Sequence, residues 1–124
     1  MVAMLKALDH ATFRSADLSR TLDFYERLLG LQAGPRPPFG VPGLWLYASG
    51  QAVLHVLEGR PAGNGPLDHV AFQACRRANV TTTLEAAGVP FDLYATPDGS
   101  ALQMFLRDPD GTRIELVFHD REDR

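Results

Sequence analysis

The feature that most constrains the fold of this chain is an internal repeat. The segment Leu8-Asp-His-Ala-Thr-Phe13 returns as Leu67-Asp-His-Val-Ala-Phe72, with four of six residues identical and with His10 and His69 at a spacing of 59. Repeated sequence indicates a repeated structural unit whose copies pack together to complete a core. We therefore expect two equivalent modules.

The repeat continues beyond the two histidines. Leu28-Leu-Gly-Leu31 is echoed by Ala86-Ala-Gly-Val89, and each glycine stands where a helix would end in a left-handed residue. Gly50-Gln-Ala-Val-Leu-His55 corresponds to Gly111-Thr-Arg-Ile-Glu115 with one residue lost. His55 and Glu115 therefore occupy equivalent positions, each inside an apolar strand.

Each half is predicted to form a strand, a helix and three further strands, which gives an α+β fold of two βαβββ modules. Apolar alternation and turn residues predict strands near 5–14, 31–34, 43–49, 52–58, 67–73, 91–95, 101–107 and 113–118. One helix, capped by Asp17 or Ser15, runs through Leu29, and a second spans about 76–87. The apolar face of the first helix would comprise Leu18, Leu22, Tyr25, Leu28 and Leu29.

Proline and glycine mark the connections between these elements. We expect loops at 34–43, 97–99 and 108–111 and a linker at 59–66 between module 1 (about 5–58) and module 2 (about 66–118). Both modules would belong to a single domain covering 1–124, with mixed sheets curled around a site.

The repeat also predicts where that site lies. If the modules pair about a pseudo-twofold axis, His10 meets His69 and the equivalent strands bring His55 and Glu115 close to them. Two imidazoles and a carboxylate suit one divalent ion such as Fe²⁺, Mn²⁺, Ni²⁺ or Zn²⁺. A lone strand histidine is more often a hydrogen-bonded structural residue, and Glu115 alone could face solvent, but their repetition favours ligands.

Several other side chains have more than one interpretation. His55 could be a fourth ligand, a proton shuttle or a residue filling a polar notch, and Glu115 could serve as ligand and catalytic base. Arg14 lies on the His10 face and could meet a substrate anion or be a surface cation. The candidate substrate-binding residues are Arg14, Trp45, Gln73, Gln103 and Phe105, although Trp45 could equally be a core aromatic. His119 has no counterpart in the repeat and is expected to be exposed.

Composition excludes several classes of function. The net charge of −3 provides no basic field for a nucleic-acid backbone, and a single cysteine, Cys75, builds no intrachain disulfide framework. No stretch approaches the ~18 apolar residues of a membrane span. We expect a cytoplasmic protein that acts on a small molecule, without a nucleic-acid or membrane partner.

The motifs together resemble the glyoxalase, bleomycin-resistance and extradiol-dioxygenase superfamily, also called vicinal oxygen chelate proteins. The resemblance rests on Leu8 to Arg14, Phe24-Tyr25, Leu28 to Leu31, the second Leu-Asp-His segment and Asp108-Pro-Asp-Gly-Thr-Arg-Ile-Glu-Leu116. It implies chelation of neighbouring substrate oxygens and stabilisation of an enolate-like intermediate. It also implies a homodimer.

The resemblance implies three alternative functions for this chain. A glyoxalase I-like lyase or isomerase would place metal ligands at His10, His55, His69 and Glu115, although the second position is usually glutamate, and Arg14 matches an arginine that binds a glutathione carboxylate. An extradiol dioxygenase would use His10, His69 and Glu115 with His55 as acid and base, but has tyrosine where this chain has Phe105. A bleomycin-type binding protein would not use these ligands. We expect the glyoxalase I-like activity, with the dioxygenase as the alternative.

Overall fold

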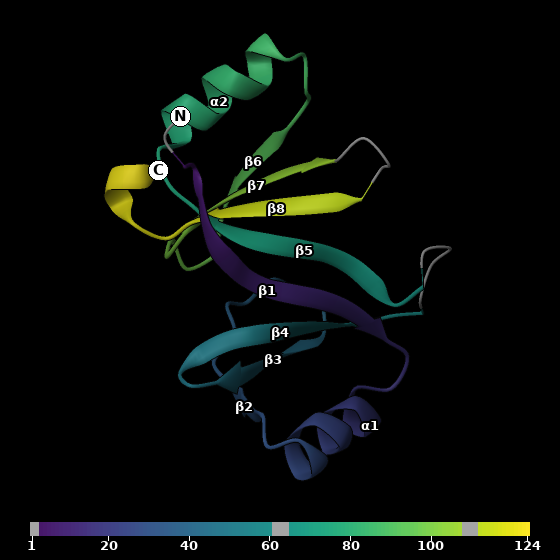
Figure 1. Cartoon of the computed structure of the whole chain (residues 1–124). Helices are drawn as coiled ribbons and strands as arrows, with labels where there is room; N and C mark the ends of the chain where they lie inside the picture. Colours follow the sequence, from purple (N-terminus) through teal and green to yellow (C-terminus); the bar gives the residue numbers. More distant parts are fainter. Residues whose placement is uncertain (1–2, 61–64, 108–111) are drawn as a thin grey trace. The chain divides into compact units, whose positions relative to one another are not determined.

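The computed structural model describes residues 3–60, 65–107 and 112–124 (Figure 1). The elements are β1 (Leu5–Ser15), α1 (Leu18–Asp23), a π-helical turn η1 (Phe24–Leu28), β2 (Gln32–Gly34), β3 (Gly43–Ala48), β4 (Gln51–Glu58), β5 (Leu67–Ala74), α2 (Arg77–Ala86), β6 (Asp92–Ala95), β7 (Leu102–Arg107), β8 (Arg113–Phe118) and a short 3₁₀ turn η2 (Arg121–Asp123). The predicted order of strand, helix and three strands in each half is confirmed. The expected turn at 108–111 and residues 61–64 of the expected linker lie outside the described residues.

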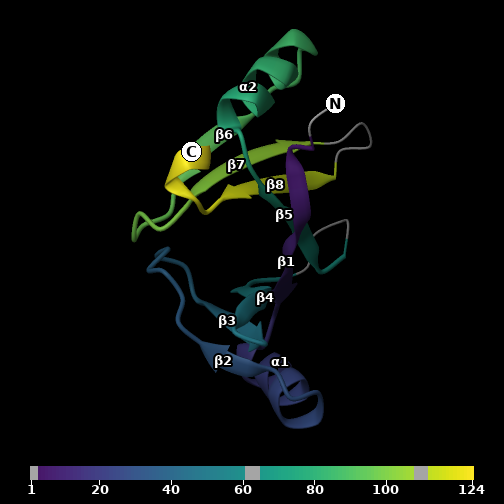
Figure 2. The same cartoon turned by 60° about the vertical axis from the view of Figure 1, so that its left-hand side comes forward.

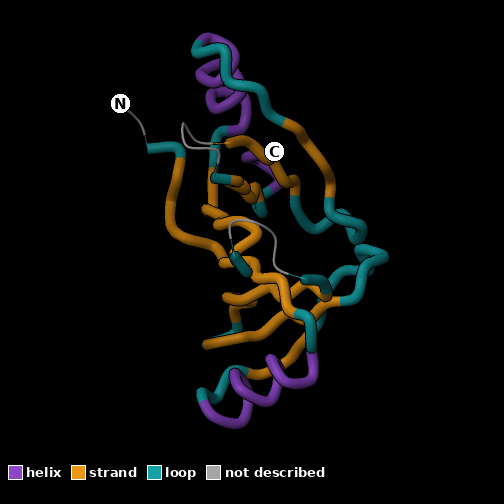
Figure 3. The backbone as a smooth tube through the Cα atoms, turned by 90° about the vertical axis from the view of Figure 1, so that its right-hand side faces the viewer, coloured by secondary structure: helices purple, strands orange, loops and turns teal. Residues whose placement is uncertain are grey.

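The strands form an eight-stranded mixed sheet in the order β2-β3-β4-β1-β5-β8-β7-β6. In the first half β1 pairs in parallel with β4, and β2, β3 and β4 are antiparallel neighbours. In the second half β5 pairs in parallel with β8, and β6, β7 and β8 are antiparallel. Each half thus repeats the same pairing scheme. The strands of both halves are the orange segments of the tube in Figure 3. Among the described residues, none of the helices has the length and apolar character that a membrane span requires.

The chain divides into two compact units, one comprising His10–His69 and the other Met1–Asp9 with Val70–Arg124. Within the first unit, α1 and η1 cover a core formed by Leu46, Leu54 and Val56 (Figure 2). Leu18, Leu22 and Tyr25 of the helical segment pack on this core. Because strand side chains alternate between faces, His55, between Leu54 and Val56, lies on the face away from the helix.

The first helix is correctly predicted at its start but not along its whole length. Asp17 caps α1 by accepting from the backbone N–H of Arg20 at 3.1 Å. A π-helical turn replaces the α-helix from Phe24. Because a π-helical turn contains more residues than an α-helical turn, the side chains that follow point in directions that a 3.6-residue repeat does not predict. Leu28 and Leu29, predicted to face the core, are therefore exposed at 56% and 61%.

In the second unit, α2 covers a core of Ala74, Val80, Met104, Leu116 and Phe118. Leu116 and Phe118 of β8 face the helix, so Glu115 lies on the opposite face of its strand. Glu115 is nevertheless 2% exposed. Each unit thus presents a polar residue, His55 or Glu115, on the face that its own helix does not cover.

The two glycines of the repeat close their helical segments as predicted. Gly30 follows η1 with φ +80° and Gly88 follows α2 with φ +69°. A Cβ added at either glycine would meet no heavy atom within 4 Å. These positions therefore require glycine for its backbone conformation and not for lack of space.

We predict that Gly88→Ala lowers the free energy of unfolding by about 1 kcal/mol, the cost of a left-handed conformation for a residue with a Cβ. Gly88→Asn, the matched control, should lose less, since asparagine tolerates this conformation. Urea unfolding followed by circular dichroism measures both. Equal stability of the alanine variant and the wild type would contradict this assignment.

Candidate metal centre

The sheet register supports the equivalence of His55 and Glu115. Thr12, two residues after His10, is the register partner of His55, and Ala71, two residues after His69, is the partner of Glu115. The same offset therefore relates each repeat histidine to the polar residue of the neighbouring parallel strand. The sequence alignment of the two halves is confirmed at these positions.

His10 and His55 belong to an aromatic stack. Their rings are 3.5 Å apart between centroids with an interplanar angle of 17°, and Trp45 stacks on the other face of His55 at 3.9 Å and 12°. The ring of His55 therefore lies face to face with the ring of His10, between His10 and Trp45.

His69 is held by hydrogen bonds at both ring nitrogens. Its Nδ1 lies 2.6 Å from Oδ2 of Asp68, and its Nε2 lies 3.0 Å from Oγ1 of Thr12. The other oxygen of Asp68 accepts from Nη2 of Arg14 at 2.5 Å. Thr12 and His69 are both buried, with 2% and 6% of their surfaces exposed. The ring orientation of His69 is therefore determined by side chains of its own unit.

Glu115 lies among residues of β7 on the opposite side from α2. Gln103 donates from Nε2 to its Oε2 at 3.1 Å. Phe105 is the register partner of Glu115 and carries the guanidinium of Arg113 over its ring at 4.2 Å. Within this unit the amide of Gln103 therefore contacts the carboxylate directly, and Phe105 lies opposite Glu115 on the adjacent strand.

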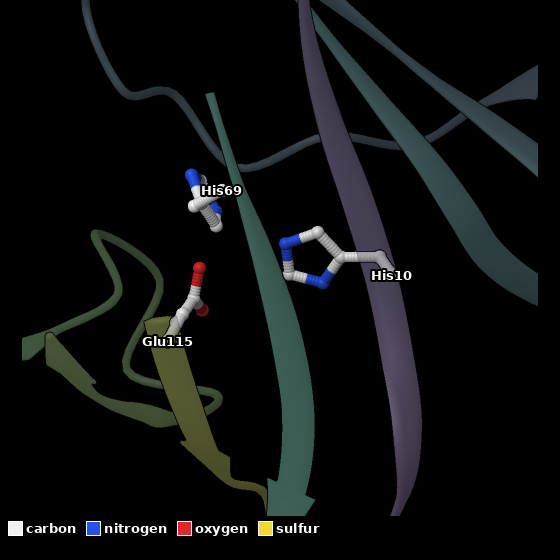
Figure 4. Close-up of side chains that lie close together, drawn as sticks. All are labelled: His10, His69 and Glu115. Atoms are coloured by element: carbon white, nitrogen blue, oxygen red, sulfur yellow. The ribbon is translucent and has the colours of Figure 1, made fainter. Parts of the chain in front are cut away.

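The ligand atoms of His10, His69 and Glu115 converge, all lying within 4.8 Å of one another. They project toward one another from β1, β5 and β8 (Figure 4). All three residues are buried. Two imidazole nitrogens and one carboxylate oxygen fit a borderline divalent ion better than Ca²⁺ or Mg²⁺, which prefer all-oxygen sites.

The remaining predicted site residues have different surroundings. His55 is absent from the convergent group found among the described residues. Arg14 forms an ion pair with Asp68, and Gln73, the partner of Val117 in the β5–β8 register, is half-buried. The contacts of Asp68 and Thr12 with His69 were not predicted from the sequence. The available sequence clue was the aspartate that precedes each repeat histidine.

The aspartate of the first repeat has a different partner. Asp9 Oδ1 lies 2.9 Å from Nε2 of His119, the residue expected to be merely exposed. The side chain of His119 is 55% exposed. Its hydrogen bond to Asp9 raises the pKa of His119 above the usual 6.5, against an opposing effect of burial.

Comparison with known proteins identifies the family. The model of the Glyoxalase/Bleomycin resistance protein/Dioxygenase superfamily matches residues 7–116, which include His10, His69 and Glu115. The chain belongs to this superfamily. Most of this superfamily are enzymes, and its members bind small molecules. The family resemblance recognised in the motifs is thereby confirmed.

Relatives within the superfamily have diverse activities. Glyoxylase I 4 of Arabidopsis thaliana is 26% identical over 122 residues, covering 90% of this chain and 70% of the plant protein. The structure resembles methylmalonyl-CoA epimerase from Mycobacterium tuberculosis (TM-score 0.75, 18% identity, covering 98% of this chain and 95% of the epimerase). It also resembles the 2,3-dioxygenase LapB from Pseudomonas sp. KL28 (TM-score 0.79, 19% identity, covering 96% of this chain). This chain spans 42% of the dioxygenase. At these identities the structural matches establish the fold alone.

The His119–Asp9 pair predicts a pH dependence of stability. Because the folded-state pKa of His119 is raised, the pair stabilises the fold fully below about pH 6.5, the unfolded value, and loses this effect as pH rises through the folded pKa. The wild type should therefore exceed His119→Gln in free energy of unfolding most at low pH, with the difference shrinking above neutrality. Urea unfolding across pH 5.5 to 8.5 measures it; a difference that grows with pH would contradict the assignment.

Proposed function

We propose that this chain is a metal-dependent enzyme that moves a proton on a carbon next to a carbonyl group, a glyoxalase I-like lyase or isomerase. The observation that carries the proposal is the buried convergence of His10, His69 and Glu115 within 4.8 Å. The proposal includes two modules related by a pseudo-twofold axis and a homodimeric assembly. It takes its substrate class from the relatives of the chain.

The three ligands would hold one divalent ion. Such an ion supplies Lewis-acid stabilisation of negative charge on substrate oxygens when one or two of them bind at its open positions. His10 and His69 would provide neutral nitrogen donors and Glu115 the anionic donor. With only three protein ligands, the site leaves positions for a chelating substrate.

Two side chains could move the proton. His55 stacks between Trp45 and His10, and we expect its ring nitrogens to lie beside the ion without binding it. An imidazole in this position can accept a proton from the substrate carbon and return it at near-neutral pH. Glu115 is the alternative base, in which case its hydrogen bond from Gln103 would hold the carboxylate as it exchanges the proton.

The relatives favour proton transfer over oxygenation. The Arabidopsis relative is named a glyoxylase, and the methylmalonyl-CoA epimerase from Mycobacterium tuberculosis matches this chain over nearly its whole length. Neither name is that of an oxygenase. The remaining substrate-binding candidates, Trp45, Gln73, Gln103 and Phe105, would form the walls of the site.

One observation favours a second candidate, an extradiol-type ring-cleaving dioxygenase. Two histidines and one carboxylate form the ligand set of non-haem Fe(II) oxygenases, and His55 stands beside this set. Assays of a hemithioacetal and a catechol, run in parallel on protein loaded with Ni²⁺, Zn²⁺ or Fe²⁺, separate the candidates. We expect turnover of the hemithioacetal. Turnover of the catechol alone, with Fe²⁺, would replace the first candidate with the second.

The first prediction from this proposal concerns Glu115. Glu115→Gln keeps the shape of the side chain but removes its charge. We expect the affinity for Zn²⁺ to fall by more than about 100-fold, because loss of a residue that only contacts a ligand usually costs 10- to 100-fold. Glu85→Gln, a change at an exposed glutamate of α2, serves as the control and should bind like the wild type. Isothermal titration measures both. Unchanged affinity in Glu115→Gln would remove Glu115 from the ligand set.

The second prediction separates the roles of His55. We expect His55 to act as a general acid or base outside the ligand set, because its ring stacks face to face on that of His10. His55→Ala should then retain its ion while kcat falls by roughly 10²- to 10⁴-fold, the range for loss of a general acid or base. Metal content and kcat with the substrate identified above provide the measurement. Loss of the ion together with activity would make His55 a fourth ligand, and full activity would exclude both roles.

A further inference from the structure

We propose that Arg14 and Asp68 form a positioning pair that sets the tautomer and orientation of His69, so that its Nε2 is presented as a metal ligand. This inference rests on the proposed function in treating His69 as a ligand. The network that carries it, Arg14, Asp68, His69 and Thr12, lies within the unit His10–His69. It assigns Arg14 a carboxylate partner within the chain in place of a substrate anion.

The contact between Asp68 and His69 determines which ring nitrogen carries the proton. Only 6% of the Asp68 side chain and 8% of the His69 side chain is exposed, and Oδ2 of Asp68 lies 2.6 Å from Nδ1 of His69. An ionised carboxylate only accepts hydrogen bonds, so Nδ1 must donate. In the opposite tautomer, the lone pair of Nδ1 would face an oxygen of the Asp68 carboxylate, and the two would repel each other. The neutral ring therefore has its lone pair on Nε2.

The contact with Thr12 is compatible with this tautomer. Its hydroxyl lies 3.0 Å from Nε2 of His69, and the hydroxyl can donate to a lone pair at that position. Both ring nitrogens are then satisfied by a single assignment of protons. The same Nε2 is the atom that an ion would use once the threonine hydroxyl turns away.

Arg14 offsets the cost of burying the Asp68 carboxylate and sets the orientation of that carboxylate. Burying a carboxylate without a partner is costly, and the guanidinium of Arg14 pairs with Oδ1 of Asp68 at 2.5 Å. With Oδ1 held by Arg14, Oδ2 is left to face His69. The backbone N–H of Arg14 also donates to the carbonyl of Pro66 at 2.7 Å, which holds β1 beside the chain entering β5.

This arrangement matches the general role of carboxylates that contact metal-binding histidines. A carboxylate that accepts from the remote nitrogen fixes the ring and raises the basicity of the ligating nitrogen, and its removal usually costs 10- to 100-fold in metal affinity. Arg14 would act through Asp68 and so influence the ion without touching it or the substrate.

Zn²⁺ titrations of single and double variants test the pair. Asp68→Asn should lower affinity at least about tenfold, and Arg14→Gln should lower it less. In the Asp68→Asn background, Arg14→Gln should have no further effect, because its partner is already uncharged. Arg14→Lys should restore part of the loss. Equal losses from Arg14→Gln in both backgrounds would overturn the proposed coupling.

A matched control is the exposed ion pair of α1 and η1, Asp23 with Arg27, whose side chains are 57% and 66% exposed. Asp23→Asn also removes an aspartate paired with an arginine, in an ion pair that does not include a histidine. It should leave Zn²⁺ affinity unchanged. A loss equal to that of Asp68→Asn would show that the effect arises from net charge and would overturn the inference.

A second readout requires neither a variant nor an ion. The ¹⁵N chemical shifts of the His69 ring in ion-free wild-type protein at about pH 8, where histidine is normally neutral, should report protonated Nδ1 and unprotonated Nε2. The reverse assignment would overturn the inference. If the wild type binds no Zn²⁺ at all, the proposed function fails, and the ¹⁵N shifts alone decide whether Asp68 sets the tautomer.

Discussion

The alternation of side chains along strands that are packed beneath a helix determines the location of the polar site. Leu54 and Val56 are buried in the core below α1, and Leu116 and Phe118 in the core below α2. Each pair flanks a polar residue, so burial of the apolar neighbours forces His55 and Glu115 to the other face. A shift of one residue in either strand would bury the polar side chain under the helix and expose two core residues.

Burial of ionisable groups on this face creates a second constraint. Glu115 is 2% exposed and His10 is 3% exposed, so their charge and hydrogen-bonding capacity must be met by neighbouring groups or by an ion. Gln103 meets part of this requirement for Glu115, and Asp68 with Thr12 meets it for His69. Two histidines and one glutamate that are all buried form a candidate metal centre, whereas an ordinary polar cluster is exposed or lacks such a set of donor atoms. The same burial explains why the histidine rings adopt defined orientations.

The sequence was sufficient to predict the order of elements and the grouping of His10, His69 and Glu115, because both follow from the repeat and from local periodicity. It was insufficient for features that depend on individual side-chain orientation. The π-helical turn exposes Leu28 and Leu29 against the simple helical pattern, since one additional residue in a turn rotates all that follow. The stacking of His55 and the pairing of Arg14 with Asp68, 54 residues away, likewise depend on rotamers and long-range contacts. From the spacing of residues in the sequence alone, three roles were possible for His55 and two for Arg14.

The central claim is that His10, His69 and Glu115 bind one divalent ion. X-ray absorption at the metal edge, combined with metal analysis of protein purified without chelators, tests this most directly. We predict about one ion per chain with scattering from two imidazole rings at ~2.0–2.1 Å together with oxygen ligands. An ion surrounded by oxygen alone, or protein that takes up no stoichiometric ion when Fe²⁺, Mn²⁺, Ni²⁺ or Zn²⁺ is supplied, would contradict it.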